Sequence, residues 1–231
     1  MKSTKRLLLT VCLAMLFVGY MVALARAAEG RALLVCTPEK CVSSWTRASD
    51  SGLVAEIVGD FQVDYKEFTI SGVRGQFSQP PQDKSKATTR LRAVVTEAPR
   101  LAQSGTDAFE LTAGDQIEID LEDEHINATG GIRIHSKETL ITAEQLVGGQ
   151  PPQMRPLIEQ ACKDMEGRIA ALVQEWLTKA SPEDRLMLIE GNVKAVDPSF
   201  TFSGQKLVAN ISSEAYLFIG PHTMEMNIDE K

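Results

Sequence analysis

The sequence predicts a mainly β fold, built of repeated hairpins and interrupted by one inserted amphipathic helix. Apolar and polar residues alternate through most of the chain, as in strands with one buried face. One stretch recurs three times without gaps, and a single segment instead has apolar residues at three- and four-residue spacing. From these observations we expect one β domain at residues 53–231, with the helical insertion at about 152–180.

The first 27 residues are typical of an export signal. Three basic residues, Lys2, Lys5 and Arg6, precede an uncharged run that ends at Ala25, and cleavage is expected after Ala27. The run is also close to the length that spans a bilayer, so a retained inner-membrane anchor fits it as well. In both cases we expect the rest of the chain to be exported from the cytoplasm.

The exported part is acidic. Removing residues 1–27 takes away four basic residues and no acidic ones, which leaves 20 basic against 31 acidic residues and a net charge near −11. Nucleic acids and anionic membrane surfaces both require clustered Lys and Arg, so we expect neither as a partner.

Residues 28–52 are expected to form a leader, and they contain two cysteines in the stretch CTPEKC. The spacing of Cys36 and Cys41 allows a small disulfide loop in an oxidising compartment, and two unpaired thiols also fit it. A zinc site needs four ligands, and no second cysteine pair or close histidine pair supplies them, so we expect no metal. Cys162 lies in the helical segment and is expected to be a small buried hydrophobe.

A repeat is visible in three stretches that align column by column. Gly59, Gly130 and Gly191 coincide, although glycine inside a strand is costly and usually marks a bulge or a bend. Each copy therefore predicts a strand, a polar turn and a second strand, with the same bend in the first strand. The stretches are EIVGDFQVDYKEFTISGVRG (56–75), NATGGIRIHSKETLITAEQL (127–146) and LIEGNVKAVDPSFTFSGQKL (188–207).

Further strands flank these copies. Residues 114–130 alternate and turn at the acidic residues 122–124, which predicts another hairpin. Residues 213–229 predict a last pair of strands, broken at Gly220-Pro221. Residues 78–89, SQPPQDKSKATT, predict a flexible loop.

One amphipathic helix is predicted over residues 155–177. Its apolar stripe should bury against the core, so we expect the helix to cap one open end of the sheet; a helix that binds a partner or a membrane surface is the alternative. The mixed charge of its polar face argues against a membrane surface. The stripe consists of Leu157, Ala161, Met165, Ile169, Leu172 and Trp176.

The pattern LTAGDQIEIDLEDEHINATGGIRIHSKETLITAEQLV resembles the OstA-like repeat of lipopolysaccharide-transport proteins, the family of LptA, LptC and the N-terminal domain of LptD. The matching features are a strand after "AGD", an "A-T-G" step and "L-x-A-x-x-L". LIEGNVKAVDPSFTFSGQKLV is similar to another copy, with Gly191-Asn192-Val193 at the family's "G-N-V". The resemblance is good over 105–147, fair over 186–229 and weak over 56–77.

This resemblance implies a twisted, slightly open OstA-like β-jellyroll whose interior holds acyl chains. It also implies a periplasmic lipid-binding carrier or bridge component, with lipopolysaccharide or a related glycolipid as its ligand. Other transport-complex proteins with β-jellyroll domains would be its partners, through pairing of edge strands. The helical segment departs from the family's compact all-β pattern and would cap or interrupt such pairing.

A lipid-lining interior has a simple physical basis, because each buried CH₂ group contributes about 0.8 kcal/mol. Inward alternation is equally common in barrels with a filled core, so a closed core remains the alternative. The expected lining residues are Ile57, Phe61, Val63, Phe68, Ile70, Ile117, Ile119, Ile126, Ile132, Ile134, Ile141, Val193, Phe200 and Phe202.

Catalysis is not expected. His125, His135 and His222 occur singly, without a nucleophile elbow, paired carboxylates or a Gly-rich phosphate loop. The acidic stretch at 122–124 is typical of a solvated turn. We expect no enzyme activity and no cofactor. The competing function is a structural or adaptor module of the cell envelope that binds partner proteins through its sheet edges or its helix.

Overall fold

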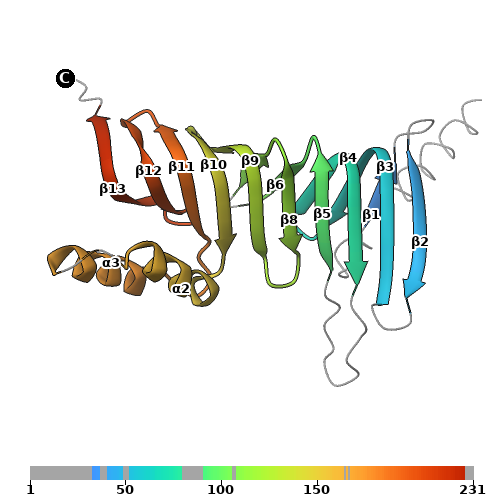
Figure 1. Cartoon of the computed structure of the whole chain (residues 1–231), viewed down its shortest axis with the longest axis horizontal. Helices are drawn as coiled ribbons and strands as arrows, with labels where there is room; N and C mark the ends of the chain where they lie inside the picture. Colours follow the sequence, from blue (N-terminus) through green and yellow to red (C-terminus); the bar gives the residue numbers. More distant parts are fainter. Residues whose placement is uncertain are drawn as a thin grey trace, which may run out of the picture.

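The computed structural model describes residues 33–36, 41–48, 52–79, 91–105, 108–163, 165 and 167–226. The expected signal segment and most of the expected loop at 78–89 lie outside these residues. The described chain forms a 13-stranded sheet and two helices, which confirms the mainly β class (Figure 1). The strands are β1 (Leu33–Cys36), β2 (Val42–Ala48), β3 (Gly52–Tyr65), β4 (Phe68–Gln79), β5 (Arg92–Glu97), β6 (Arg100–Gln103), β7 (Phe109–Thr112), β8 (Gln116–Asp120), β9 (His125–Ser136), β10 (Thr139–Gly149), β11 (Leu186–Val196), β12 (Phe200–Asn210) and β13 (Ala215–Met226), and the helices are α2 (Pro151–Ala161) and α3 (Arg168–Lys179).

All strands belong to one antiparallel sheet. Pairing follows the order β1-β3-β4-β5-β8-β9-β10-β11-β12-β13, and the additional pairs of β6 and β7 close a ring of six strands, β4-β5-β8-β9-β7-β6. The register is continuous from the β5–β8 pairing to the β6–β7 pairing. Ala93 in β5 pairs with Ile119 in β8, and Leu101 in β6 pairs with Leu111 in β7. The two pairs are eight residues apart along each strand, so no residue is inserted on either side. β5 and β6 are therefore two halves of one bent strand, and so are β7 and β8.

A β-bulge marks the bend in each repeated hairpin. Gly59, Gly130 and Gly191 have φ angles of 106°, 90° and 82°, and the register of β3–β4, β9–β10 and β11–β12 shifts beside them. Glycine adopts positive φ easily because it has no Cβ atom. The predicted threefold repeat is confirmed. Gly220 in β13, with φ of 80° and its own register shift, adds a fourth bend that the alignment missed.

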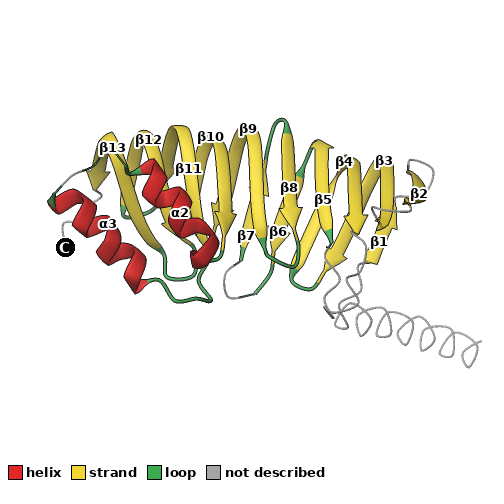
Figure 2. Cartoon of the chain, turned by 60° about the horizontal axis from the view of Figure 1, so that its bottom comes forward, coloured by secondary structure: helices red, strands yellow, loops and turns green. Residues whose placement is uncertain are grey.

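The bends divide the sheet into two arms that face each other. The first arm contains β2, β5 and β8, the second arm contains β1, β6 and β7, and each long strand contributes one half to each arm. Figure 1 and Figure 2 show the strands stacked side by side along the long axis of the molecule. Inward side chains of both arms form a single core cluster. The core is therefore a long apolar layer between two walls of one folded sheet.

The helical insertion differs from the prediction in two ways. It forms two helices, because Gly167, with φ of 60°, separates α2 from α3. The break changes the helical phase, so Met154, Ile158, Val173 and Leu177 are the residues that are fully buried. Of the expected stripe, Leu157, Ala161, Met165 and Trp176 pack partly buried against the sheet, whereas Leu172 is half-exposed. The side chain of Ile169 lies outside the described residues.

The two helices also cover a different surface from the expected one. They pack on the outer side of the first arm at β10–β13, where Leu186, Leu188 and Val208 point away from the main core (Figure 2). Cys162 is buried among these residues, as expected, and burial raises the pKa of its thiol. The helices therefore add a second, smaller core and do not cap an open end of the sheet. Within the described residues, neither helix has the length and apolar character needed to span a bilayer.

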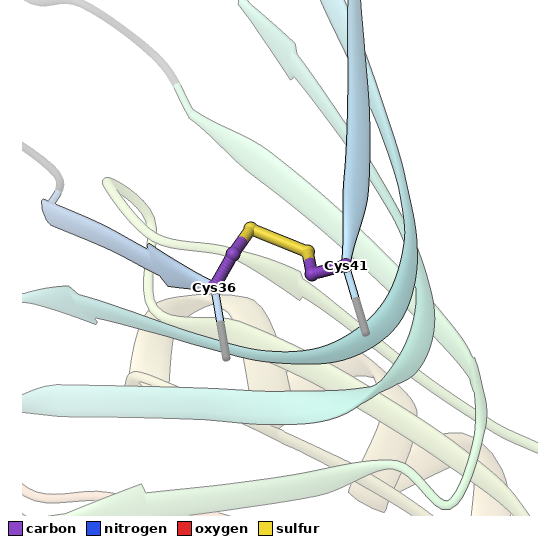
Figure 3. The surroundings of a disulfide bond; sticks show 2 residues. All are labelled: Cys36 and Cys41. Carbon is purple, nitrogen blue, oxygen red and sulfur yellow. A yellow bond between two sulfur atoms is a disulfide. The ribbon is translucent and has the colours of Figure 1, made fainter. Parts of the chain in front are cut away.

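The sheet begins earlier than the predicted domain boundary at residue 53. β1 and β2 both pair with β3, one on each side of its bend, so part of the expected leader belongs to the sheet. A disulfide between Cys36, at the end of β1, and Cys41, directly before β2, joins these two strands, with the Cα atoms 5.5 Å apart (Figure 3). At the other end, the expected last pair of strands is one strand, β13, bent at Gly220.

Candidate functional site

The fourteen residues expected to line the interior are brought together. All of them belong to the core cluster between the arms, and each is 8% exposed or less. Inward residues of β10, β11 and β12, including Leu146, Ile189 and Leu207, also belong to it and were missed. In β11 the run Leu-Met-Leu-Ile is apolar on both faces, because α2 and α3 cover the outer one, so alternation could not identify the inward residues.

Protein side chains pack this interior closely. Phe202 stacks on Phe218 with a centroid separation of 4.4 Å, and Phe61 meets Phe77 edge to face at 5.8 Å. Phe202 itself has 0% exposed surface. An acyl chain therefore enters this interior only if the two arms separate.

The ends of the two arms meet along a line that we call the seam. Turns 66–67 and 137–138 of the second arm contact turns 121–124 and 211–214 of the first arm. Each contact joins turns that are several strands apart in the pairing order. The ends of the second arm are therefore displaced along the sheet relative to the ends of the first arm. The seam is polar, whereas the layer beneath it is apolar.

Arg185 is the most buried charge of the seam. Its side chain is 10% exposed, and Nη2 lies 2.7 Å from Glu67 Oε1 and 2.8 Å from Glu124 Oε2. The guanidinium also lies 5.2 Å from the centre of the Phe68 ring. One residue, placed directly before β11, thus joins the turns of both arms. Burial protects such a pair from the screening that weakens exposed ion pairs.

Replacing Arg185 with methionine should lower the free energy of unfolding by about 1–3 kcal/mol, because two partly buried carboxylates lose their partner. The estimate is below that for a fully buried pair, since Glu67 is 40% exposed. Lys66→Met is the matched control at the same seam, and the exposed pair with Glu122 should contribute less than about 1 kcal/mol. Urea denaturation of both variants measures the difference. Equal losses would show that Arg185 does not hold the arms together.

A second group of seam contacts surrounds Thr139, which is buried. The Thr139 hydroxyl donates to Asp197 Oδ2 at 2.6 Å and accepts from the Tyr216 hydroxyl at 3.3 Å. Burial alone would raise the pKa of Asp197, but hydrogen bonds from Ser199 and Thr139 outweigh burial and lower it. Burial raises the pKa of Tyr216. Asp197 is therefore held as a carboxylate at the edge of the apolar interior.

A pocket of about 370 Å³ opens at this part of the seam. Its volume is within the range of about 300–1,000 Å³ that is usual for small-molecule sites. Lys137 and Glu214 form an ion pair from opposite arms beside it. The lining residues are Ser136, Lys137, Glu138, Thr139, Asp197, Pro198, Ser199, Ile211, Glu214 and Tyr216.

The three histidines lie at separate places on the sheet. His135 and His222 are exposed on the second arm, and His125 lies on the first arm, where β9 begins. The described part of the chain holds no group of three or more His, Cys, Asp or Glu side chains that could hold a metal ion. The acidic turn at 122–124 takes part in the seam instead, through Glu122 and Glu124.

The interior and the polar seam are thus two features of the described residues that offer binding chemistry. No protein-family model and no curated protein matches the chain, so a functional proposal has to rest on its own residues and their geometry.

Proposed function

We propose that this chain is a periplasmic lipid-binding carrier or bridge component in the transport of lipopolysaccharide or a related outer-membrane glycolipid, with an OstA-like β-jellyroll fold. One observation carries the proposal: inward residues of every bent strand join into a single apolar layer between two arms. The arms are continuous at the bends, and at the seam side chains of the described residues join them through ion pairs. Such a layer is suited to long apolar chains, because the hydrophobic effect is non-directional.

Binding would require the arms to part along the seam. Ten CH₂ groups of an acyl chain gain about 8 kcal/mol on burial. This gain exceeds the roughly 1–3 kcal/mol expected for the Arg185 contacts. The difference is available to offset the packing lost between the aromatic rings. Acyl chains would then replace side-chain contacts between the arms, while the polar part of the lipid stays at the seam.

Transfer between proteins would use the two edges of the sheet. β13 is the last strand at one end of the pairing order, and β1 and β2 are the last strands at the other end. Among the described residues, the outer edges of these strands have no neighbouring strand. Edge strands present N–H and C=O groups that can pair with another chain. α3 lies beside the β13 end (Figure 1), so a partner at that edge would also meet this helix. Pairing at both edges would extend the apolar layer from one protein to the next.

The adaptor function is the second candidate, and the close packing of the interior favours it. Ile134, Phe202 and Leu111 have 0% exposed surface, as in a core that never opens. In that case the fold would serve only to present its edges and helices to other envelope proteins.

Site-specific photo-crosslinking tests the lipid-binding function. We expect p-benzoylphenylalanine at Phe61 or Phe202, both inward, to form adducts with glycolipid in cells. The same group at Gln62 or Ser203, the exposed neighbours on the same strands, should form none. The inward variants must first be shown to fold by circular dichroism. Folded inward variants that capture no lipid would support the adaptor function instead.

A further inference from the structure

The seam pocket defined above has a chemistry that selects its ligand. The hydroxyl of Ser199 donates to Asp197 Oδ1 at 2.5 Å, and the hydroxyl of Ser136 donates to the carbonyl oxygen of Ala108 at 3.2 Å. Thr139 donates to Asp197 and Tyr216 donates to Thr139. The hydroxyl protons of the pocket are therefore used within the protein. What these groups still offer to a ligand is acceptor capacity.

The charges that line the pocket also favour a ligand that donates hydrogen bonds. Three carboxylates line the pocket, those of Glu138, Asp197 and Glu214, against the single ammonium of Lys137, which is paired with Glu214. A phosphate or another anion would meet like charges, which is unfavourable. A ligand that donates hydrogen bonds, through hydroxyl groups or a protonated amine, would find partners.

The pocket also adjoins the apolar interior. Ile211 lines the pocket and belongs to the main core cluster. Tyr216 lines it as well, and its ring meets the core ring of Phe200 edge to face at 5.5 Å. A polar group in the pocket therefore lies directly against the layer proposed for acyl chains.

From these observations we infer that the seam pocket binds the sugar part of the lipid, through sugar hydroxyl or amino groups, and that it rejects a phosphate-bearing sugar at this position. The inference rests on the proposed function for the acyl chains, but the pocket's choice of sugar is a property of its own residues. Glu138 and Glu214 are the groups that would accept from the ligand. Asp197, held by Ser199 and Thr139, shapes the site.

Three soluble sugars without acyl chains test the inference on the whole protein. Glucose, glucosamine and glucose 6-phosphate are titrated at pH 6.5 and followed by amide chemical shifts in NMR. We expect shifts confined to residues 136–139, 197–199 and 211–216, with glucosamine binding best and at least about tenfold more tightly than glucose 6-phosphate. Equal binding of all three sugars, or no shift at these amides, would overturn the inference.

Substitution of Glu138 adds a second readout. Glu138→Gln removes one exposed carboxylate from the pocket and should weaken glucosamine binding more than glucose binding, since only the amine carries a charge. Glu56→Gln makes the same charge change on the exposed face of β3 and should change neither. An unchanged ratio of the two affinities in Glu138→Gln would contradict the assigned role. The photo-crosslinking of Phe61 and Phe202 is independent of these results, so failure of the sugar site and failure of the lipid function are distinguishable.

Discussion

Gly130→Ala should destabilise the protein by about 3–5 kcal/mol, because a steric conflict with a neighbouring backbone would be added to backbone strain. Gly130 has φ of 90°, and a Cβ atom there would lie 2.2 Å from Asp115 Cγ and 2.4 Å from the Asp115 backbone nitrogen. The neighbouring strand cannot move away freely, because the Gly114 amide donates to the Gly130 carbonyl oxygen at 2.8 Å. Two adjacent strands would have to shift at their bends.

Gly131→Ala is the matched control. Gly131 also has positive φ, 76°, but a Cβ atom there would meet nothing within 4 Å. Only the backbone strain remains, so we expect a loss of about 1–2 kcal/mol. Urea denaturation of both variants gives the comparison. If the two losses are equal, close contact between the bends is not what requires glycine at position 130.

Phe202→Ala should cost about 3–5 kcal/mol, as is usual when a buried aromatic side chain is truncated. Phe202 has 0% exposed surface and stacks on Phe218, so its loss leaves a cavity between the two arms. Phe202→Leu keeps most of the volume and should lose less than about 1.5 kcal/mol. Denaturation midpoints and m-values of both variants are the measurement.

Ser203→Ala is the control on the exposed face of the same strand, with an expected change within about 0.5 kcal/mol. If Phe202→Ala were as stable as this control, the interior at β12 would contribute nothing to stability. The proposal of an apolar layer between the arms would then lose its physical basis.

The repeat was predictable because its signal is local. Gly59, Gly130 and Gly191 have positive φ, which a residue with a Cβ atom adopts only with strain. Each of them lies within a single hairpin. The alternation of Ile117, Ile119 and the residues after the turn at 121–124 is equally local, and its inward faces were predicted correctly.

The remainder depended on contacts between distant parts of the chain. The helical stripe was only partly correct, because the break at Gly167 changes the helical phase between two helices that each pack on the sheet separately. The first strand was missed because β1 and β2 are short halves whose pairing partner, β3, binds them on either side of a bend. The Arg185 contacts were invisible in the sequence, since they depend on how the sheet is rolled.

The order of pairing has a consequence for how the chain reaches this state. Every bent strand pairs with the strands that precede and follow it in the sequence, and the helical insertion is the longest connection between such neighbours among the described residues. Local pairings of this kind form quickly, since little chain entropy is lost in closing them. Arg185 and Glu67, by contrast, are 118 residues apart. The hairpins can therefore form one after another along the chain. The long-range ion pairs that join the ends of the two arms form only late in folding.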